Sequence, residues 1–282
     1  MTNTAAEQIL QSVRDGDGQA VYDFAEVLVT KSDVAQLLEV PPGFLGVRFM
    51  CLRDSVTLSG VRVPMTPPQL QQLADLLDCM LPTPRLLDWR HIAARARGIA
   101  VEPTYRVGPT IAAEADGPTI AAEADLGAYN MAVSWAVEHA FNALPLSRRV
   151  ETMTAPVDGV GKSWVLINEL AGRTDKKVYN YGWHGRASWL QFEPVTRGAW
   201  RVGQPVAGAH NYAHVDPSQG TFGLFAREAM VHWEHGDQLT TIEDLGHDDV
   251  LGRIVSHQRY LHVHRLPGVP VTGPSVRLGG AR

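Results

Sequence analysis

The segment TPPQLQQLADLLDCMLPTPRLLDWRHIAARARG, residues 66–98, carries strong helix signals in the first half of the chain. Thr66 and Thr83 each precede a proline, and a threonine N-cap followed by proline at the first helical position marks a helix start. Gln69 follows Thr66 at capping-box spacing. Leucines then recur at helical spacing, and Gly98 ends the second run. The segment therefore predicts two consecutive helices that form an αα-hairpin.

Upstream of this segment, β-branched and apolar residues concentrate at 47–52 and 56–63, with the polar residues Arg53 to Ser55 between them. Two such runs around a short polar turn predict a β-hairpin. Apolar residues at helical spacing also predict a short leading helix at residues 4–14.

Downstream, the nonapeptide GPTIAAEAD occurs twice in tandem at residues 108–125, and a unit this short indicates a local duplication rather than a solenoid. Helical spacing follows at 126–144 and ends at Pro145. The composition then shifts toward strands, with a short helix expected at 248–257. The expected strands are Trp164–Ile167, Lys177–Tyr181, Trp189–Phe192, Phe222–Phe225 and Tyr260–His264.

These patterns predict an α+β fold with a helical N-terminal half and a mostly antiparallel β-sheet in the C-terminal half. We expect a helix-rich region with a β-hairpin at residues 1–145. The sheet-rich region at 146–282 carries the site. The two regions form either one interlocked unit or two halves that meet near residue 146.

Composition and charge argue against several classes of protein, namely those that bind nucleic acid, span a membrane or depend on disulfides. The 282 residues carry a net charge of −5 with 45% hydrophobic and 20% charged residues, which is typical of a globular protein. No basic run predicts nucleic-acid binding, and no 18-residue apolar run predicts a membrane span. No secretory signal pattern is visible at the start, so we expect a cytoplasmic protein. Two cysteines are too few for a disulfide framework.

The chemistry-bearing residues gather in the second half, where eight of the eleven histidines lie beyond residue 200. Ser218, with Asp216 and either His184 or His210, could supply a nucleophile, an orienting carboxylate and a base for acyl transfer. The same Asp-Pro-Ser-Gln-Gly segment is also typical of a turn.

Metal binding is an alternative reading of these histidines. His210 and Asp216, with His264 as third ligand, have the residue types of a zinc site, in which His262 would assist the metal-bound water. On a strand, His262 and His264 would face the same side. A two-histidine, one-carboxylate iron site built from His214, Asp216 and a distal His257, His262 or His264 is a further alternative.

Aromatic and amide side chains could complete a recognition groove. Tyr181, Trp183 and Gln204 are the expected substrate-binding residues. The same groups could instead line a non-catalytic binding module, and aromatic residues on strands also pack in cores.

The chain resembles an uncharacterised family of bacterial proteins with the order Y-G-W-H, then Q-P, then H-x5-D-x-S-x-G. Here these are the segments 181–184, 204–205 and 210–220, and the likeness extends upstream to Leu81-Pro82-Thr83 and Asp88. The resemblance covers most of residues 45–255 and implies no function. It gives weight to the four catalytic candidates over His214 and the His262/His264 pair.

A fainter likeness links Ser218-Gln219-Gly220-Thr221 to the S-H-G-C segment of L,D-transpeptidases, with threonine in the cysteine position. Loss of that thiol argues against the same reaction. We expect a hydrolase or acyl-transfer enzyme that acts on an amide or ester of a peptide-like, cell-wall-like or small-molecule substrate, with zinc as the candidate cofactor.

Overall fold

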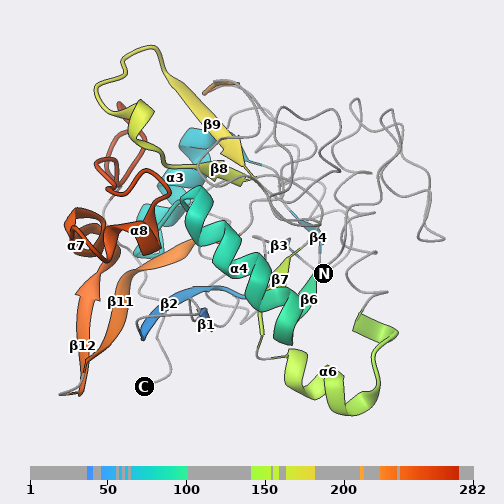
Figure 1. Ribbon diagram of the computed structural model, residues 1–282. Helices are drawn as coiled ribbons and strands as arrows, with labels where there is room; N and C mark the ends of the chain where they lie inside the picture. Colours follow the sequence, from blue (N-terminus) through green and yellow to red (C-terminus); the bar gives the residue numbers. More distant parts are fainter. Residues whose placement is uncertain are drawn as a thin grey trace, which may run out of the picture.

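The structure is a computed structural model, and it describes a discontinuous set of segments (Figure 1). These are residues 37–40, 46–54, 57–58, 61–62, 65–100, 141–153, 155–158, 163–181, 210–212, 223–233 and 236–272. The expected helices at 4–14 and most of 126–144, and the expected strand at 189–192, lie outside these residues.

Helices and antiparallel sheets are both present, as expected for an α+β protein. The strands are β1 (Leu37–Val40), β2 (Val47–Leu52), β3 (Thr57–Leu58), β4 (Val61–Arg62), β5 (Cys79–Met80), β6 (Ile99–Ala100), β7 (Val157–Asp158), β8 (Ser163–Val165), β9 (Lys177–Tyr181), β10 (His210–Asn211), β11 (Phe225–Trp233) and β12 (Gly236–Thr241). The helices are α3 (Pro67–Leu76), α4 (Pro84–Arg97), α6 (Leu146–Thr152), α7 (Ile242–His247) and α8 (Gly252–Val255), with a 3-10 turn η1 at Asn168–Leu170.

The largest sheet joins strands from both halves of the sequence. Its order is β1-β2-β11-β12, with β5 also paired to β11. The pairs within it are antiparallel. A second sheet has the order β10-β9-β8. The helical and sheet-forming parts are therefore less segregated along the chain than expected.

The expected hairpin of residues 47–52 with 56–63 does not form. Residues 47–52 are strand β2, but β2 pairs with β1 on one edge and β11 on the other. Both edges are therefore taken by strands from elsewhere in the chain, and β3 and β4 pair with each other instead. A central strand needs two neighbouring strands. The short turn after β2 predicts a hairpin partner that follows it in sequence, but it carries no information about β1 or β11.

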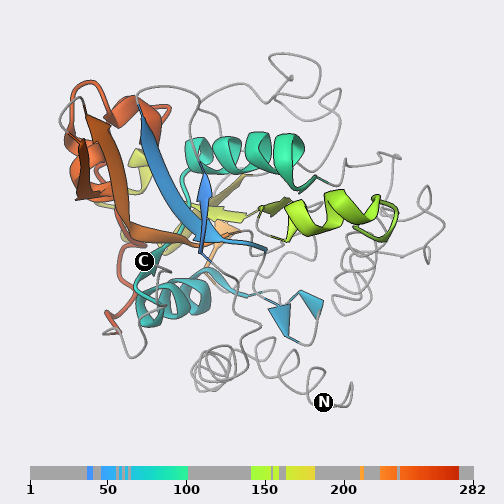
Figure 2. The same cartoon turned by 90° about the horizontal axis from the view of Figure 1, so that it is seen from below.

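Both helices of the segment at 66–98 form where expected. The Thr66 side chain accepts a hydrogen bond from the backbone of Gln69 in a capping box, and Thr83 caps α4 through the Leu86 amide. The connection is not a simple αα turn, because β5 lies between the helices and pairs with β11. Figure 2 shows α3 and α4 as two separate helices beside strands β2 and β11.

A buried arginine fixes α4 against the sheet. Arg90 is fully buried and donates hydrogen bonds to the carbonyl oxygens of Leu52 at 2.6 Å and Val157 at 2.7 Å. Gly223, with a φ of 53°, lies against the guanidinium, and a Cβ there would come within 1.9 Å of Arg90 Nη1. The close approach therefore requires glycine.

A second buried charge fixes the segment that follows α8. Asp75 on α3 accepts hydrogen bonds from Arg265 at 2.7 Å and Arg227 at 3.2 Å. Beside it, Gln71 accepts a bond from the Leu266 amide at 2.9 Å. Residues 265–266 are therefore attached to α3 immediately after His264.

The C-terminal part differs from expectation in four places. The expected strand at 222–225 is the start of the longer β11, and α7 was not expected. The expected helix at 248–257 is present as the single turn α8. Residues 260–264 form no strand, because their backbone bonds go to the Asn168 side chain and to Gly246. No helix within the described segments has the length and apolar character needed to cross a membrane.

Candidate functional site

Three elements from distant parts of the chain bring a carboxylate, a phenol and an imidazole together in the core. Asp88 lies on α4, Tyr181 is the last residue of β9, and His257 follows α8. The Asp88 and His257 side chains are 9% and 3% exposed, and Tyr181 is fully buried. We call this group the Asp88 network.

The two oxygens of one carboxylate have different partners. The Tyr181 hydroxyl donates a hydrogen bond to Asp88 Oδ1 at 2.6 Å. His257 Nε2 lies 2.6 Å from Asp88 Oδ2. With Asp88 ionised, Nε2 carries the proton that it donates to the carboxylate, and Nδ1 is then the basic nitrogen of the neutral ring.

The surroundings of Asp88 shift the pKa values of two neighbouring side chains, Tyr181 and Arg85. Burial raises the pKa of Tyr181 well above its ordinary value, and the Asp88 charge raises it further, so the phenol stays protonated as a donor. Burial lowers the pKa of Arg85, one helical turn before Asp88, while the Asp88 carboxylate opposes that shift. The Arg85 guanidinium stacks over the Trp89 ring at 4.1 Å from its centroid.

The backbone that carries His257 is attached to α4 on the same side. Trp89 Nε1 donates a hydrogen bond to the Ile254 carbonyl at 2.9 Å. The Thr83 hydroxyl, besides capping α4, donates to the Val255 carbonyl at 2.5 Å. Trp89 of α4 and the N-cap residue Thr83 therefore hold α8 in place, which fixes the position of the imidazole relative to Asp88.

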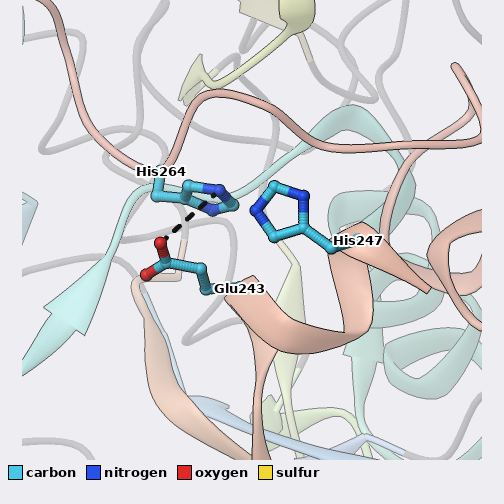
Figure 3. A group of neighbouring side chains, drawn as sticks. All are labelled: Glu243, His247 and His264. Atoms are coloured by element: carbon cyan, nitrogen blue, oxygen red, sulfur yellow. Dashed lines mark ion pairs between the residues drawn. The ribbon is translucent and has the colours of Figure 1, made fainter.

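A second group lies at the surface beside α7. Glu243 and His247 are four residues apart and project from one face of this helix toward His264 (Figure 3). His264 Nε2 lies 3.8 Å from Glu243 Oε1, and the rings of His247 and His264 have centroids 5.3 Å apart. One candidate ligand atom from each residue lies within 4.8 Å of the others. We call this group the Glu243 cluster.

His264 is the least exposed member of the Glu243 cluster. Its side chain is 15% exposed, while Glu243 is 57% exposed. Burial lowers the pKa of His264, the Glu243 carboxylate opposes this shift, and the His247 ring lowers the pKa further. The imidazole is therefore held toward its neutral form.

The other histidine of the expected HxH pair also lies beside α7. The His262 ring centroid is 6.0 Å from that of His247, and the ring stacks on Tyr260 at the same centroid distance with an interplanar angle of 19°. The expectation that His262 and His264 would share one face of a strand is wrong, because residues 260–264 form none. Both rings nevertheless flank His247.

The remaining predicted site residues divide into two sets. His210 begins β10, where it is paired with Val178 of β9. Tyr181 belongs to the Asp88 network, where its hydroxyl is bound to a carboxylate inside the core. The other predicted residues lie outside the described segments: Trp183, His184, Gln204, His214, Asp216 and Ser218.

Sequence reasoning missed the partners that the structure supplies. Glu243 and His247 carried a usable signal, because a carboxylate and an imidazole at i and i+4 share one face of a helix. That signal was hidden because α7 itself was not expected. Asp88 appeared only through the resemblance, and His257 only as an alternative iron ligand. No family model, curated protein or solved structure matches the chain.

Proposed function

We propose that the protein is a hydrolase or acyl-transfer enzyme in which His257 is the general base and Asp88 orients it. The observation that carries this proposal is the 2.6 Å contact between His257 Nε2 and a buried carboxylate. A carboxylate bound to one imidazole nitrogen fixes the tautomer and leaves the other nitrogen able to take a proton. It also stabilises the imidazolium that forms.

In the proposed reaction, His257 first accepts a proton from the nucleophile and later donates it to the leaving group. His257 Nδ1 takes the proton from a hydroxyl nucleophile as its oxygen attacks the carbonyl carbon of an ester or amide. When the tetrahedral intermediate collapses, the same nitrogen returns the proton to the departing alcohol or amine. Ser218 remains the candidate nucleophile from the sequence, and water is the acceptor that completes hydrolysis.

The properties of Arg85 favour a substrate that carries a carboxylate, which this side chain would bind. Its guanidinium lies close enough to Asp88 and Tyr181 to influence their electrostatics, and burial lowers its own pKa. Its Nε is buried without a hydrogen-bond partner in the described part of the chain. A planar cation with an unused donor is suited to a carboxylate. Peptide-like substrates carry that group.

Two further observations favour a functional role for the Asp88 network over a purely structural one. Asp88 and Tyr181 both belong to the sequence pattern that marks the resemblance, and they are in direct contact. Tyr181 also begins the Tyr-Gly-Trp-His segment. His184 therefore follows the Asp88-bound tyrosine by three positions in the sequence.

A covalent probe tests the proposal without knowledge of the natural substrate. Wild-type protein is treated with a fluorophosphonate, which labels hydroxyl nucleophiles that an adjacent base activates, and the adduct is located by mass spectrometry. We expect labelling at Ser218, and a labelling rate about 100-fold to 10,000-fold lower in His257→Gln and Asp88→Asn. The variant Ser218→Ala should take no label.

The matched control is His232→Gln, because His232 also contacts an aspartate at 2.6 Å but lies at the surface. This variant should label at the wild-type rate. Equal labelling of wild type and His257→Gln would exclude His257 as the base. Binding of a carboxylate-bearing peptide by wild type without any labelling or turnover would instead indicate a non-catalytic binding module.

A further inference from the structure

The Glu243 cluster combines the donor atoms of a metal site in a fixed arrangement. Figure 3 shows two of its side chains on α7 and the third on the segment that crosses the helix. Helical geometry aligns Glu243 with His247. The position of His264 depends on tertiary contacts, and these contacts decide whether the three groups form a site.

His264 is held from both sides of its own backbone. On one side, Arg265 and Leu266 are attached to Asp75 and Gln71 of α3. On the other, the Leu261 amide donates to the Gly246 carbonyl at 3.0 Å. The backbone at 264 is therefore fixed before any ligand binds, which reduces the entropy lost on binding.

Gly246 allows the His264 segment to approach α7 this closely. A Cβ at position 246 would lie 2.8 Å from the Cβ of Leu261 and 3.3 Å from its carbonyl oxygen. Gly246 lies between Glu243 and His247 in the helix. A glycine therefore occurs at the point of α7 where the segment that carries His264 passes closest to the helix.

The His264 ring has unused hydrogen-bonding capacity. Neither Nδ1 nor Nε2 has a hydrogen-bond partner within the described segments, although both atoms are buried. A buried polar nitrogen without a partner is destabilising, because it has lost its hydrogen bonds to water. A cation bound to one nitrogen would use that lone pair. No comparable compensation comes from Glu243, because 3.8 Å is too long for a hydrogen bond.

The distances require only a modest adjustment. Ligand atoms in a tetrahedral zinc site are about 3.3 Å apart, given metal–ligand distances of about 2.0–2.1 Å. The three groups lie within 4.8 Å of one another before metal binds. Glu243 and His247 are exposed and can rotate about their side-chain bonds, while the backbone at His264 stays fixed.

We propose that Glu243, His247 and His264 bind one Zn²⁺ ion at the surface beside α7. Two imidazoles and one carboxylate form a ligand set used by zinc sites that keep a coordination position for water. The mixed nitrogen and oxygen donors favour Zn²⁺ over Mg²⁺ and Ca²⁺, which prefer oxygen ligands. His262 stays outside the ligand set, stacked on Tyr260.

This site goes beyond the proposed acyl-transfer function and uses none of its residues. A three-ligand zinc ion at the surface lowers the pKa of bound water to about 7 and can polarise a carbonyl or phosphoryl oxygen. The chemical class of its ligand is therefore water or an oxygen donor of a substrate. The two proposals depend on different side chains and can be tested separately.

Binding is measured on the full chain after the affinity tag is removed and the metal is stripped with a chelator. Titration calorimetry with Zn²⁺ should give one ion per chain with a dissociation constant of about 1 μM or lower. Co²⁺ should produce the intense visible absorption of a four- or five-coordinate site. Mg²⁺ and Ca²⁺ at millimolar concentration should not displace it.

Substitutions then assign the ligands. His264→Ala should weaken Zn²⁺ binding by more than about 100-fold, and Glu243→Gln and His247→Gln by at least about 10-fold each. Glu243 and His247 are exposed, so their variants should keep the wild-type unfolding midpoint without metal. His232→Gln is the matched control, because it removes an exposed histidine that also has a carboxylate partner. It should bind Zn²⁺ like wild type.

Two results would overturn the site. One is a wild-type dissociation constant weaker than about 100 μM, which describes adventitious binding to surface histidines. The other is an unchanged Zn²⁺ affinity in His247→Gln and Glu243→Gln. Failure here remains separate from failure of the acyl-transfer proposal, since His257→Gln should retain zinc binding and His247→Gln should retain fluorophosphonate labelling.

Discussion

Asp88 and Tyr181 are 93 residues apart in the chain and are joined by a 2.6 Å hydrogen bond inside the core. This bond connects α4 to β9 and places the start of the Tyr-Gly-Trp-His segment on a buried carboxylate. A hydrogen bond to a charged group is worth more than one between neutral groups. The contact therefore fixes the end of β9 against α4.

Tyr181→Phe removes one donor from Asp88 and changes almost nothing else in shape. We expect the free energy of unfolding to fall by about 1.5–3 kcal/mol, because a buried carboxylate loses a charged hydrogen bond. Urea unfolding followed by tryptophan fluorescence measures the change. The control is Tyr212→Phe, whose hydroxyl donates to the neutral Pro267 carbonyl, and it should cost about 0.5–1.5 kcal/mol. Equal costs would show that the bond to the carboxylate is no stronger than the bond to a neutral carbonyl.

Gly246→Ala places a methyl group 2.8 Å from the Leu261 Cβ. Helix propensity alone would stabilise the alanine variant by about 1 kcal/mol. We expect the opposite sign, a loss of about 1–3 kcal/mol, because the close contact forces the segment with His264 away from α7. Zn²⁺ affinity should fall together with stability.

A double-mutant cycle with Leu261→Gly isolates that contact. Since the glycine removes the opposing Cβ, the cost of Gly246→Ala should be smaller in this background. Stabilisation by Gly246→Ala in the wild-type background would mean that the crossing segment can move without penalty.

Arg90→Met keeps much of the side-chain length but removes the guanidinium. Three backbone carbonyls lose their donor, those of Leu52, Arg53 and Val157. We expect a loss of more than about 3 kcal/mol in the free energy of unfolding. Arg90→Lys should recover only part of this, because an ammonium cannot match the planar arrangement of donors. Full recovery by lysine would show that charge alone is required.

Alkaline pH should destabilise the protein through buried groups that resist ionisation. Burial raises the pKa of Cys79 from 9.0 to about 12, and the nearby Asp78 charge adds to the shift. Below pH 9 the thiol is protonated in both states, so it has no effect. Above pH 9 the unfolded state loses the proton first, and the unfolding free energy falls by up to about 1.4 kcal/mol per pH unit until pH 12.

Urea unfolding at pH 8, 9 and 10 measures this slope. Tyr181 adds to it above pH 10, because its folded-state pKa is also raised. Cys79→Ala should be flatter between pH 9 and 10 than wild type. If the two slopes were equal, the buried thiol would have no part in the alkaline loss.

Much of the local structure follows directly from the sequence. The helices after Thr66 and Thr83 begin at their caps and prolines, because capping bonds and proline geometry depend on residues only a few positions apart. Strand β9 lies where it is predicted for the same reason, whereas α8 covers only part of the helix expected at 248–257. The prediction of a strand at 260–264 is wrong. The Asn168 side chain makes hydrogen bonds there with backbone groups that a neighbouring strand would otherwise pair with.

Short-range signals in the chain establish where the helices after Thr66 and Thr83 start, that helices and strands both occur, and that histidines concentrate in the second half. The partners of these elements follow from long-range packing. It placed β2 between β1 and β11, Asp88 between Tyr181 and His257, and His264 beside Glu243 and His247. Local structure depends on short-range bonds that neighbouring residues specify. The pairing of separate elements depends instead on which arrangement buries the apolar surface and satisfies the buried charges.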